Sequence, residues 1–219
     1  MLRAILWFQQ KCILKKVKPN LKLLLQKEKN TMIKEQLKKI ETGIVKKQDI
    51  LENLVNVVYL GIGSNLGNKV HNIQKAKYLL EKNSIQILKS SNFYETFSWP
   101  DKSKPKFYNV VVKIITKSDP KKLFLIIKNI EKKLGRKKKK VNSPRICDID
   151  ILDYKGLTYN FSINNDKLII PHPRLHNRNF VLFPLFEIEK NWKHPLKKTK
   201  IQDLIGKLDN SSLYSIKQI

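Results

Sequence analysis

The chain has 219 residues, a formal net charge of +27 and a hydrophobic content of 41%, enough for one domain with a proper core plus an appendage. Its two cysteines, Cys12 and Cys147, lie far apart, and no apolar stretch approaches the ~20 residues of a membrane span, so a disulfide framework, a zinc site and a membrane-spanning class are not indicated. The charge alone would favour nucleic acid or an anionic membrane, but most of it is dispersed lysine, and we expect neither partner.

Residues 1–54 are predicted to form a basic N-terminal extension that is helical or weakly ordered. They contain 13 basic and 5 acidic residues, with no acid before Glu28, and they lack a strand-like run. A targeting or membrane-surface helix is one interpretation. The favoured alternatives are a weakly ordered extension or a start codon assigned too early, with Met32 as another possible start. We expect the domain proper to span residues 55–219.

From residue 55 the pattern becomes regular. Residues 55–62 predict a strand that ends in the turn Gly61-Ile-Gly-Ser-Asn-Leu-Gly67. These glycines match neither a dinucleotide fingerprint nor a P-loop, so the turn is interpreted as the wall of a pocket. Asn68 is a candidate N-cap for a helix whose apolar face contains Val70, Ile73, Ala76 and Leu80.

The next elements continue an alternation of strands and helices. Residues 85–97 and 107–115 predict two strands joined by a loop, and Asp119-Pro120 begins a helix with the stripe Leu123, Ile127, Ile130 and Leu134. Gly135 is its expected stop, followed by a basic loop at residues 136–140. Then come an acidic strand near Asp148, short strands at 159–163 and 168–170, and an apolar helix at 180–189. The order βαββαβ predicts an α+β ferredoxin-like sandwich, an antiparallel sheet with helices on one face and a site on the other.

Two carboxylates stand two residues apart in the run Ser143-Pro-Arg-Ile-Cys-Asp-Ile-Asp-Ile-Leu-Asp153. Alternate side chains of a strand share one face, so Asp148 and Asp150 point the same way. A lone Asp-x-Asp is more often a solvated strand face. Like charges this close are stabilised by a cation between them, which favours a divalent-metal site, Mg²⁺ above all, with Arg145 placed to hold a bridged anion.

A second motif, Pro171-His-Pro-Arg-Leu-His-Asn-Arg-Asn-Phe180, supports the metal interpretation. It combines imidazole and guanidinium donors in a way that suits a polyphosphate. The chain has only five arginines, and four of them fall between positions 136 and 178: Arg136, Arg145, Arg174 and Arg178. This clustering indicates a need for planar bidentate donors rather than for positive charge alone.

Four motifs in order resemble those of the 6-hydroxymethyl-7,8-dihydropterin pyrophosphokinase family. They are Gly61-Ile-Gly-Ser-Asn-Leu-Gly67, Thr96 followed by Pro105-Lys-Phe-Tyr-Asn109, Pro144-Arg-Ile-Cys-Asp-Ile-Asp150 and Pro171-His-Pro-Arg-Leu-His-Asn-Arg-Asn-Phe-Val181. The resemblance covers residues 55–195. It implies transfer of pyrophosphate from ATP to the hydroxymethyl oxygen of the pterin, giving AMP and the pterin diphosphate, in folate biosynthesis.

The resemblance also implies a role for individual residues. Asp148 and Asp150 are expected to ligate two Mg²⁺ ions and to act in catalysis together with Arg136 and Arg145. Phe107 and Phe180 would stack on the pterin. The full pterin set is Thr96, Phe97, Phe107, Asn109 and Phe180. The expected ATP contacts are Lys128, Glu131, Arg136, Arg145, Ile151, Lys167, His172 and Arg178.

The sequence departs from the commoner family pattern in the nucleotide half of the site. Lys128 replaces a frequent glutamine, and Lys167 replaces an arginine. The basic loop between Arg136 and Arg145 is one residue shorter than usual and lacks its tryptophan.

Two other classes are compatible with parts of the sequence. A basic RNA-binding module would explain the charge, but it requires aromatic residues on a central strand where residues 147–151 carry acids. A metal-dependent nuclease or phosphatase would explain the acid pair but not Phe107 and Phe180 with Asn109. We therefore expect small-molecule substrates, a monomer, and a cytoplasmic location.

Overall fold

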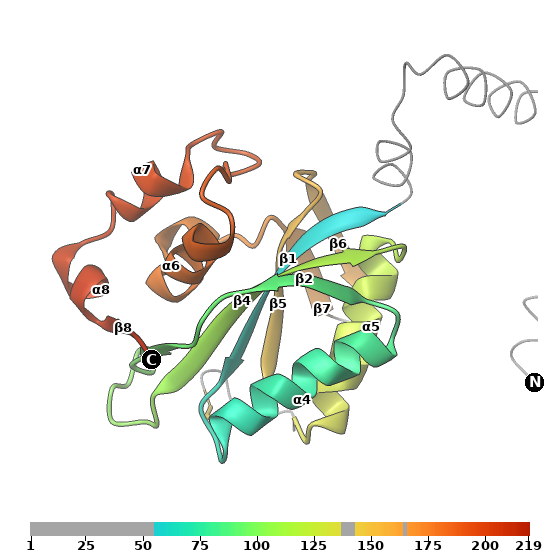
Figure 1. The fold of residues 1–219 in the computed structure, drawn as a ribbon, viewed down its shortest axis with the longest axis horizontal. Coiled ribbons are helices and arrows are strands. Elements are labelled where there is room, and N and C mark those ends of the chain that lie inside the picture. The colour runs from blue at the N-terminus through green and yellow to red at the C-terminus, as the bar shows by residue number, and fades with distance from the viewer. Residues whose placement is uncertain (1–54, 137–142, 164–165) are drawn as a thin grey trace, which may run out of the picture. The chain divides into compact units, whose positions relative to one another are not determined.

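The computed structural model describes residues 55–136, 143–163 and 166–219. A six-stranded antiparallel sheet lies at the centre of this part of the chain (Figure 1). The strand order is β5-β1-β4-β3-β8, and β2 pairs with β4. The strands are β1 (Asn56–Ser64), β2 (Gln86–Ser90), β3 (Tyr94–Thr96), β4 (Phe107–Thr116), β5 (Asp148–Tyr154) and β8 (Ile216–Gln218). The predictions for residues 1–54 and for loop positions 137–140 lie outside the described residues.

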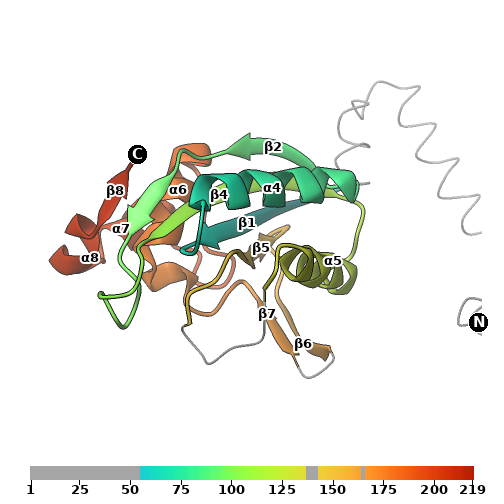
Figure 2. The same cartoon turned by 90° about the horizontal axis from the view of Figure 1, so that it is seen from below.

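Two helices connect the strands and lie along the sheet in Figure 2, α4 (Lys69–Lys82) and α5 (Pro120–Lys133). Both predicted N-caps are confirmed, since Asn68 accepts a hydrogen bond from the His71 amide and Asp119 from the Lys122 amide, each at 3.0 Å. Gly135 follows α5 with φ +90°, the left-handed geometry that glycine adopts without strain.

The main hydrophobic core lies between the sheet and these two helices. The four apolar residues predicted to face the core from the second helix, Leu123, Ile127, Ile130 and Leu134, are all buried in it. Of the four predicted for α4, three are buried, Ile73, Ala76 and Leu80. The fourth, Val70, lies in the first turn of α4 and is 41% exposed. With α4 and α5 on one face of an antiparallel sheet, the predicted ferredoxin-like architecture is confirmed.

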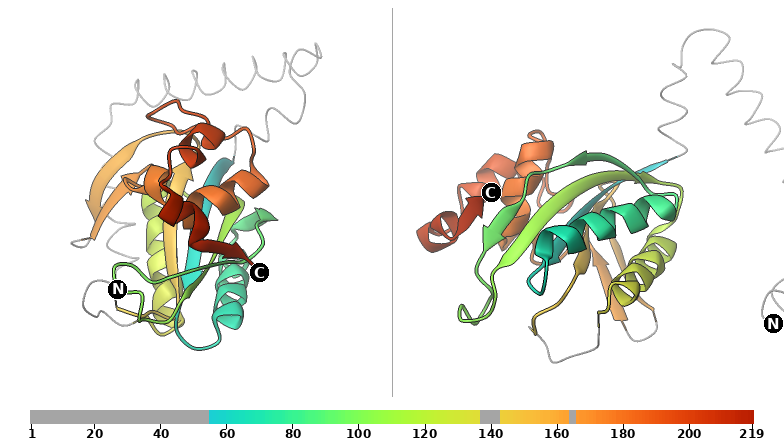
Figure 3. Two further views of the ribbon diagram at one scale, coloured as in Figure 1. Left: turned by 90° about the vertical axis from the view of Figure 1, so that its left-hand side faces the viewer. Right: turned by 60° about the horizontal axis from the view of Figure 1, so that its bottom comes forward.

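A second hydrophobic cluster covers part of the opposite face. The helix α6 (Asn179–Ile188), predicted at 180–189, packs there with α7 (Ile201–Ile205) against Tyr59, Val111 and Leu152 of the sheet. These C-terminal elements, with η1 (Leu175–Asn177) and α8 (Asn210–Tyr214), lie at the end of the sheet away from α5 in Figure 3. The face that the sequence assigned to a site is therefore shared between a site and a smaller core.

The predicted single strand at residues 85–97 is wrong, because it breaks into β2 and β3. At the break, Ser91 bonds Val111 through both its backbone and its hydroxyl: the Ser91 amide donates to the Val111 carbonyl at 2.9 Å, and Ser91 Oγ accepts from the Val111 amide at 3.0 Å. A side-chain oxygen that replaces a backbone acceptor interrupts the ladder. The short strands at 159–163 and 168–170 are confirmed as the hairpin β6 (Tyr159–Ile163) and β7 (Asp166–Ile170).

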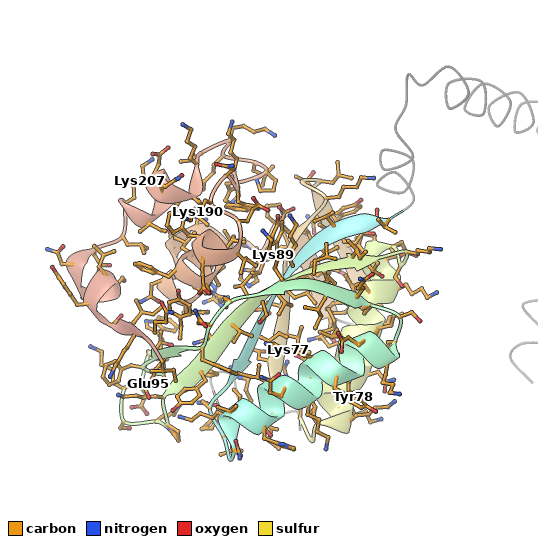
Figure 4. All side chains as sticks on the ribbon, viewed as in Figure 1. Lys77, Tyr78, Lys89, Glu95, Lys190 and Lys207 are labelled. Carbon is orange, nitrogen blue, oxygen red and sulfur yellow. The ribbon has the colours of Figure 1, made fainter. Side chains whose placement is uncertain are left out.

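Lysines are spread over many elements. Four labelled in Figure 4, Lys77, Lys89, Lys190 and Lys207, come from α4, from β2 and from positions just after α6 and α7. Among the described residues, no helix is long and apolar enough to cross a membrane.

Candidate active site

The register of three neighbouring strands brings the acidic motif and the aromatic motif to one face of the sheet. On β1, Gly63 pairs with Asp148 of β5 on one side and with Asn109 of β4 on the other; Gly61 pairs in the same way with Asp150 and with Val111. Residues that pair directly across a sheet point to the same side. This is the face of the smaller core, to which Val111 belongs.

Strand β1 has no side chains at the centre of this face, because the two residues that point to this face are Gly61 and Gly63. A Cβ atom on Gly63 would lie 2.9 Å from Asn109 Oδ1 and 3.6 Å from the ring of Phe107. The neighbouring side chains therefore lean over the space that a side chain here would fill. Glycine at position 63 therefore lets Asn109 and Phe107 pack directly against the β1 backbone.

The carboxylate of Asp148 is held by two arginines. Its Oδ1 accepts from Arg136 Nη1 at 2.6 Å and its Oδ2 from Arg145 Nη1 at 2.7 Å. Asp150 Oδ2 accepts from Arg178 Nη1 at 3.3 Å, with His172 Nε2 4.0 Å away. The two aspartates remain 25% and 39% exposed, so both are open to a ligand.

The buried carboxylate of Glu131 holds Arg136 in this cluster. Glu131 is 1% exposed; its Oε1 accepts from the Ile149 amide at 2.8 Å and from Arg136 Nη1, and its Oε2 accepts from Lys128 Nζ at 3.1 Å. Burial raises the pKa of Glu131, and the charges of Lys128 and Arg136 oppose that rise. Only Glu131 is buried in these pairs, since the Lys128 and Arg136 side chains are 37% and 29% exposed.

Burial and neighbouring charges shift the pKa values of Arg136 and His172 in opposite directions. Burial alone would lower the pKa of Arg136, but Asp148 and Glu131 raise it above its ordinary value. Burial lowers the pKa of His172, an effect that Asp150 opposes and Arg178 reinforces. The cluster thus offers permanent guanidinium donors beside a neutral imidazole, a set suited to phosphate oxygens.

The amide and aromatic residues lie on the adjoining strands. Asn109 Nδ2 donates to Thr96 Oγ1 at 3.0 Å, and both residues are buried, with Thr96 paired to Phe107 across β3 and β4. This bond leaves Asn109 Oδ1 facing the glycine strip. Phe180, in the first turn of α6, lies against the smaller core, and the guanidinium of Arg178 stacks over its ring at 5.3 Å. Arg178 thereby connects the aromatic side of the site to Asp150.

Other expected contact residues are placed less directly. Phe97 is 45% exposed, with the Lys106 ammonium over its ring, and the side chain of Ile151 points into the main core, so only its backbone can reach a ligand. Lys167 lies exposed on β7. Of the four clustered arginines, three contact the acid pair, whereas the Arg174 backbone amide donates to His172 Nδ1 at 3.1 Å.

The donor set fits Mg²⁺ shared with a phosphorylated substrate. Mg²⁺ in proteins commonly uses one or two carboxylates and takes its remaining ligands from phosphate oxygens and water. Asp148 and Asp150 supply such a pair. The described residues contain no group of three or more His, Cys, Asp or Glu that could hold a metal by themselves.

Sequence reasoning missed two features of the site. Gly63 and Asn65 were assigned only to a structural turn, yet Gly63 lies between the two halves of the site and Asn65 bonds to both of them. The available signal was the Gly-x-Gly spacing, which has the same period of two as Asp-x-Asp and so puts both glycines on one strand face.

The fold and site define an α+β, ferredoxin-like domain with a carboxylate and arginine cluster beside Asn109, Phe107 and Phe180. The family model of 7,8-dihydro-6-hydroxymethylpterin-pyrophosphokinase (HPPK) matches residues 59–190. The chain belongs to this family, which confirms the resemblance seen in its motifs.

Relatives and solved structures agree with this assignment. The 2-amino-4-hydroxy-6-hydroxymethyldihydropteridine pyrophosphokinase of Aquifex aeolicus is 40% identical over 146 residues, which are 67% of this chain and 88% of that protein. Folic acid synthesis protein fol1 of Pneumocystis carinii is 37% identical over 164 residues; the match covers 75% of this chain but only 21% of that longer protein. A crystal structure of Plasmodium falciparum HPPK-DHPS A437G with pteroate matches 77% of this chain and 47% of its own, with a TM-score of 0.62 at 19% identity, which shows the shared fold.

Proposed function

We propose that this chain transfers pyrophosphate from ATP to the hydroxymethyl group of 6-hydroxymethyl-7,8-dihydropterin, giving AMP and the pterin diphosphate, in folate biosynthesis. The observation that carries the proposal is the pairing of Gly63 with Asp148 on one side and Asn109 on the other. This pairing supports the proposal because only Gly63, which has no side chain, separates Asp148 and its arginines from Asn109. Family membership gives this arrangement its substrates.

The phosphate half of the site neutralises charge. Asp148 and Asp150 would hold two Mg²⁺ ions, which when bound would polarise the phosphate oxygens of ATP. Arg136, Arg145 and Arg178 are already gathered at the acid pair. Guanidinium groups in this position can turn from the carboxylates to the triphosphate and remain charged while doing so. His172 adds a ring nitrogen beside them, and Lys128, the Ile151 backbone and Lys167 complete the proposed nucleotide contacts. Glu131, which is buried, would act through Lys128 and Arg136.

The pterin half of the site fixes orientation. Thr96 holds the Asn109 amide so that Oδ1 faces the ligand space and can accept an N–H from the pterin edge. Phe107 and Phe180 offer aromatic faces for stacking, and the backbone around Thr96 and Phe97 supplies further donors and acceptors. These contacts aim the hydroxymethyl oxygen at the β-phosphorus of ATP.

Positioning and charge neutralisation supply most of the rate in this proposal. The transition state of phosphoryl-type transfer is largely dissociative, so a strong general base is not required. The arginines beside Asp148 stabilise charge that develops on the leaving AMP oxygen and on the transferred group.

The proposal also covers the domain boundary, the oligomeric state and the cellular location. Residues 55–219 would be the catalytic domain and residues 1–54 an extension without a catalytic role. The protein would act as a cytoplasmic monomer on small molecules, with no nucleic acid or membrane partner.

The test is AMP formation measured with ATP and Mg²⁺, with and without the hydroxymethyl pterin. We expect AMP only when the pterin is present, together with one equivalent of pterin diphosphate by mass spectrometry. ATP breakdown that does not depend on the pterin would instead favour a phosphatase-type activity and refute the proposal.

A further inference from the structure

The turn that follows β1 contains a buried asparagine that bonds to both halves of the site. Asn65 is 3% exposed. Its backbone amide donates to the Arg145 backbone carbonyl at 3.2 Å, and its side-chain Oδ1 accepts from the Arg145 backbone amide at 2.7 Å. Its Nδ2 donates to Ser98 Oγ and to the Pro105 carbonyl, each at 3.2 Å. All of the hydrogen-bonding groups on its side chain are thus directed at two segments that are distant in sequence.

Each of these segments carries functional groups of one half of the site. Arg145 donates its guanidinium to Asp148. The segment from Ser98 to Pro105 lies between Thr96 and Phe107, and Ser98 Oγ closes it by donating to the Pro105 carbonyl at 2.6 Å. Neither segment is a strand or a helix at these positions, so the sheet does not fix them.

We propose that Asn65 is a positioning residue that holds the Arg145 segment and the 98–105 loop in one fixed relation, and so aligns the triphosphate with the pterin. The choice of ligands rests on the proposed function. Asn65 itself touches neither the acid pair nor the aromatic residues; it acts through Arg145 on one side and through the loop on the other. The pterin and nucleotide halves therefore share one anchor.

An ordinary structural role would also satisfy these hydrogen bonds, so the test must separate the two. Asn65→Asp has nearly the same shape and still accepts from the Arg145 amide, but it has no N–H for Ser98 or Pro105 and places a negative charge beside the Pro105 carbonyl. Asn65→Ala removes every side-chain bond to both segments and keeps only the backbone bond from residue 65 to the Arg145 carbonyl. These two variants therefore separate the loop from the arginine segment.

Asn72 of α4, whose side chain bonds to the same turn, offers a control. Asn72 Nδ2 also donates to a serine hydroxyl and to a carbonyl, Ser64 Oγ at 3.2 Å and Leu66 O at 2.8 Å. Asn72→Asp removes donor bonds of the same kind from the same turn without touching either half of the site. A loss caused by missing donor bonds to the turn appears in both aspartate variants. Burial of a charge occurs only in Asn65→Asp and is absent from Asn65→Ala.

The experiment measures pterin affinity in the presence of Mg²⁺ and a non-hydrolysable ATP analogue, affinity for the analogue alone, kcat, and the melting temperature. For Asn65→Asp we expect pterin affinity to fall ~10-fold, which corresponds to about one or two lost hydrogen bonds. Affinity for the analogue should change less than ~2-fold. For Asn65→Ala we expect kcat to fall at least ~10-fold as well, since the Arg145 amide also loses its side-chain acceptor. If Asn65→Asp matches Asn72→Asp in pterin affinity and kcat, Asn65 is only a turn residue and the inference is wrong.

Hydrogen exchange gives a readout that needs no substrate. In Asn65→Asp, amide exchange should quicken in residues 98–106 while the Arg145 amide stays protected; in Asn65→Ala both should quicken. Unchanged exchange in both segments would overturn the inference even if the enzyme were active. Absence of pterin binding by the unmutated protein, with exchange as expected, would refute the proposed function and leave the anchoring role standing.

Discussion

Replacing Gly63 with alanine is expected to weaken pterin binding about tenfold while leaving the fold intact. The new Cβ would lie 2.9 Å from Asn109 Oδ1, against the 3.4 Å or more of an ordinary contact, so the Asn109 amide must move by about half an ångström. Asn109 is buried and bonded to Thr96, and it cannot move without straining that bond. The group that we propose reads the pterin edge is thus displaced.

The stability of the domain should change little, because two effects oppose each other. Weakening the Asn109 bond to Thr96 costs about 1 kcal/mol. Restricting the unfolded chain by replacing a glycine whose backbone conformation alanine can adopt stabilises by about 0.4–1 kcal/mol. One or two misplaced hydrogen bonds to the ligand, at about 1 kcal/mol each, give the tenfold loss in affinity.

The assay is calorimetric titration with the pterin in the presence of Mg²⁺ and a non-hydrolysable ATP analogue, with urea unfolding as the check on stability. Gly61→Ala is the matched control, because its Cβ would meet only Leu152 at an ordinary 3.5 Å. Pterin affinity in Gly63→Ala equal to that in Gly61→Ala would refute the reasoning. So would an equal loss of affinity for the ATP analogue.

Further variants test the remaining parts of the site. Asp150→Ala should abolish pterin-dependent AMP release without lowering the melting temperature, because one carboxylate cannot hold two Mg²⁺ ions against the triphosphate; near-normal turnover would remove the metal assignment. Phe180→Ala should weaken pterin binding by ~1–3 kcal/mol and hardly change ATP affinity, and equal losses would make it a core residue. Burial lowers the pKa of His194 to about 4, so the free energy of unfolding, which is highest above the ordinary pKa of about 6.5, should fall as the pH drops from there toward 4. His194→Asn keeps an acceptor for the Leu196 and Lys197 amides and should flatten that slope in urea unfolding at a series of pH values; an unchanged slope would show that His194 is not its source. A chain beginning at Asn53 should melt cooperatively and turn over like the full chain, and loss of the melt would move the proposed domain boundary.

Local patterns in the sequence determined the elements and the chemistry of the acid pair. The N-caps at Asn68 and Asp119 and the buried stripe of α5 depend on neighbours within one or two helical turns, so the sequence alone predicts them. Asp148 and Asp150 share a face because a strand alternates, whatever it pairs with. The motifs that carry the family resemblance also needed only order and spacing.

Only the tertiary structure decided how these parts meet. The break at Ser91, the smaller core under α6 and the pairing of Gly63 with both Asp148 and Asn109 depend on register between distant strands, and a shift of one residue would send each side chain to the other face. Glu131 resembled a nucleotide contact in sequence, yet the fold buries it beneath Arg136. Burial and hydrogen-bond partners arise from contacts between segments far apart in the chain, which no local pattern records.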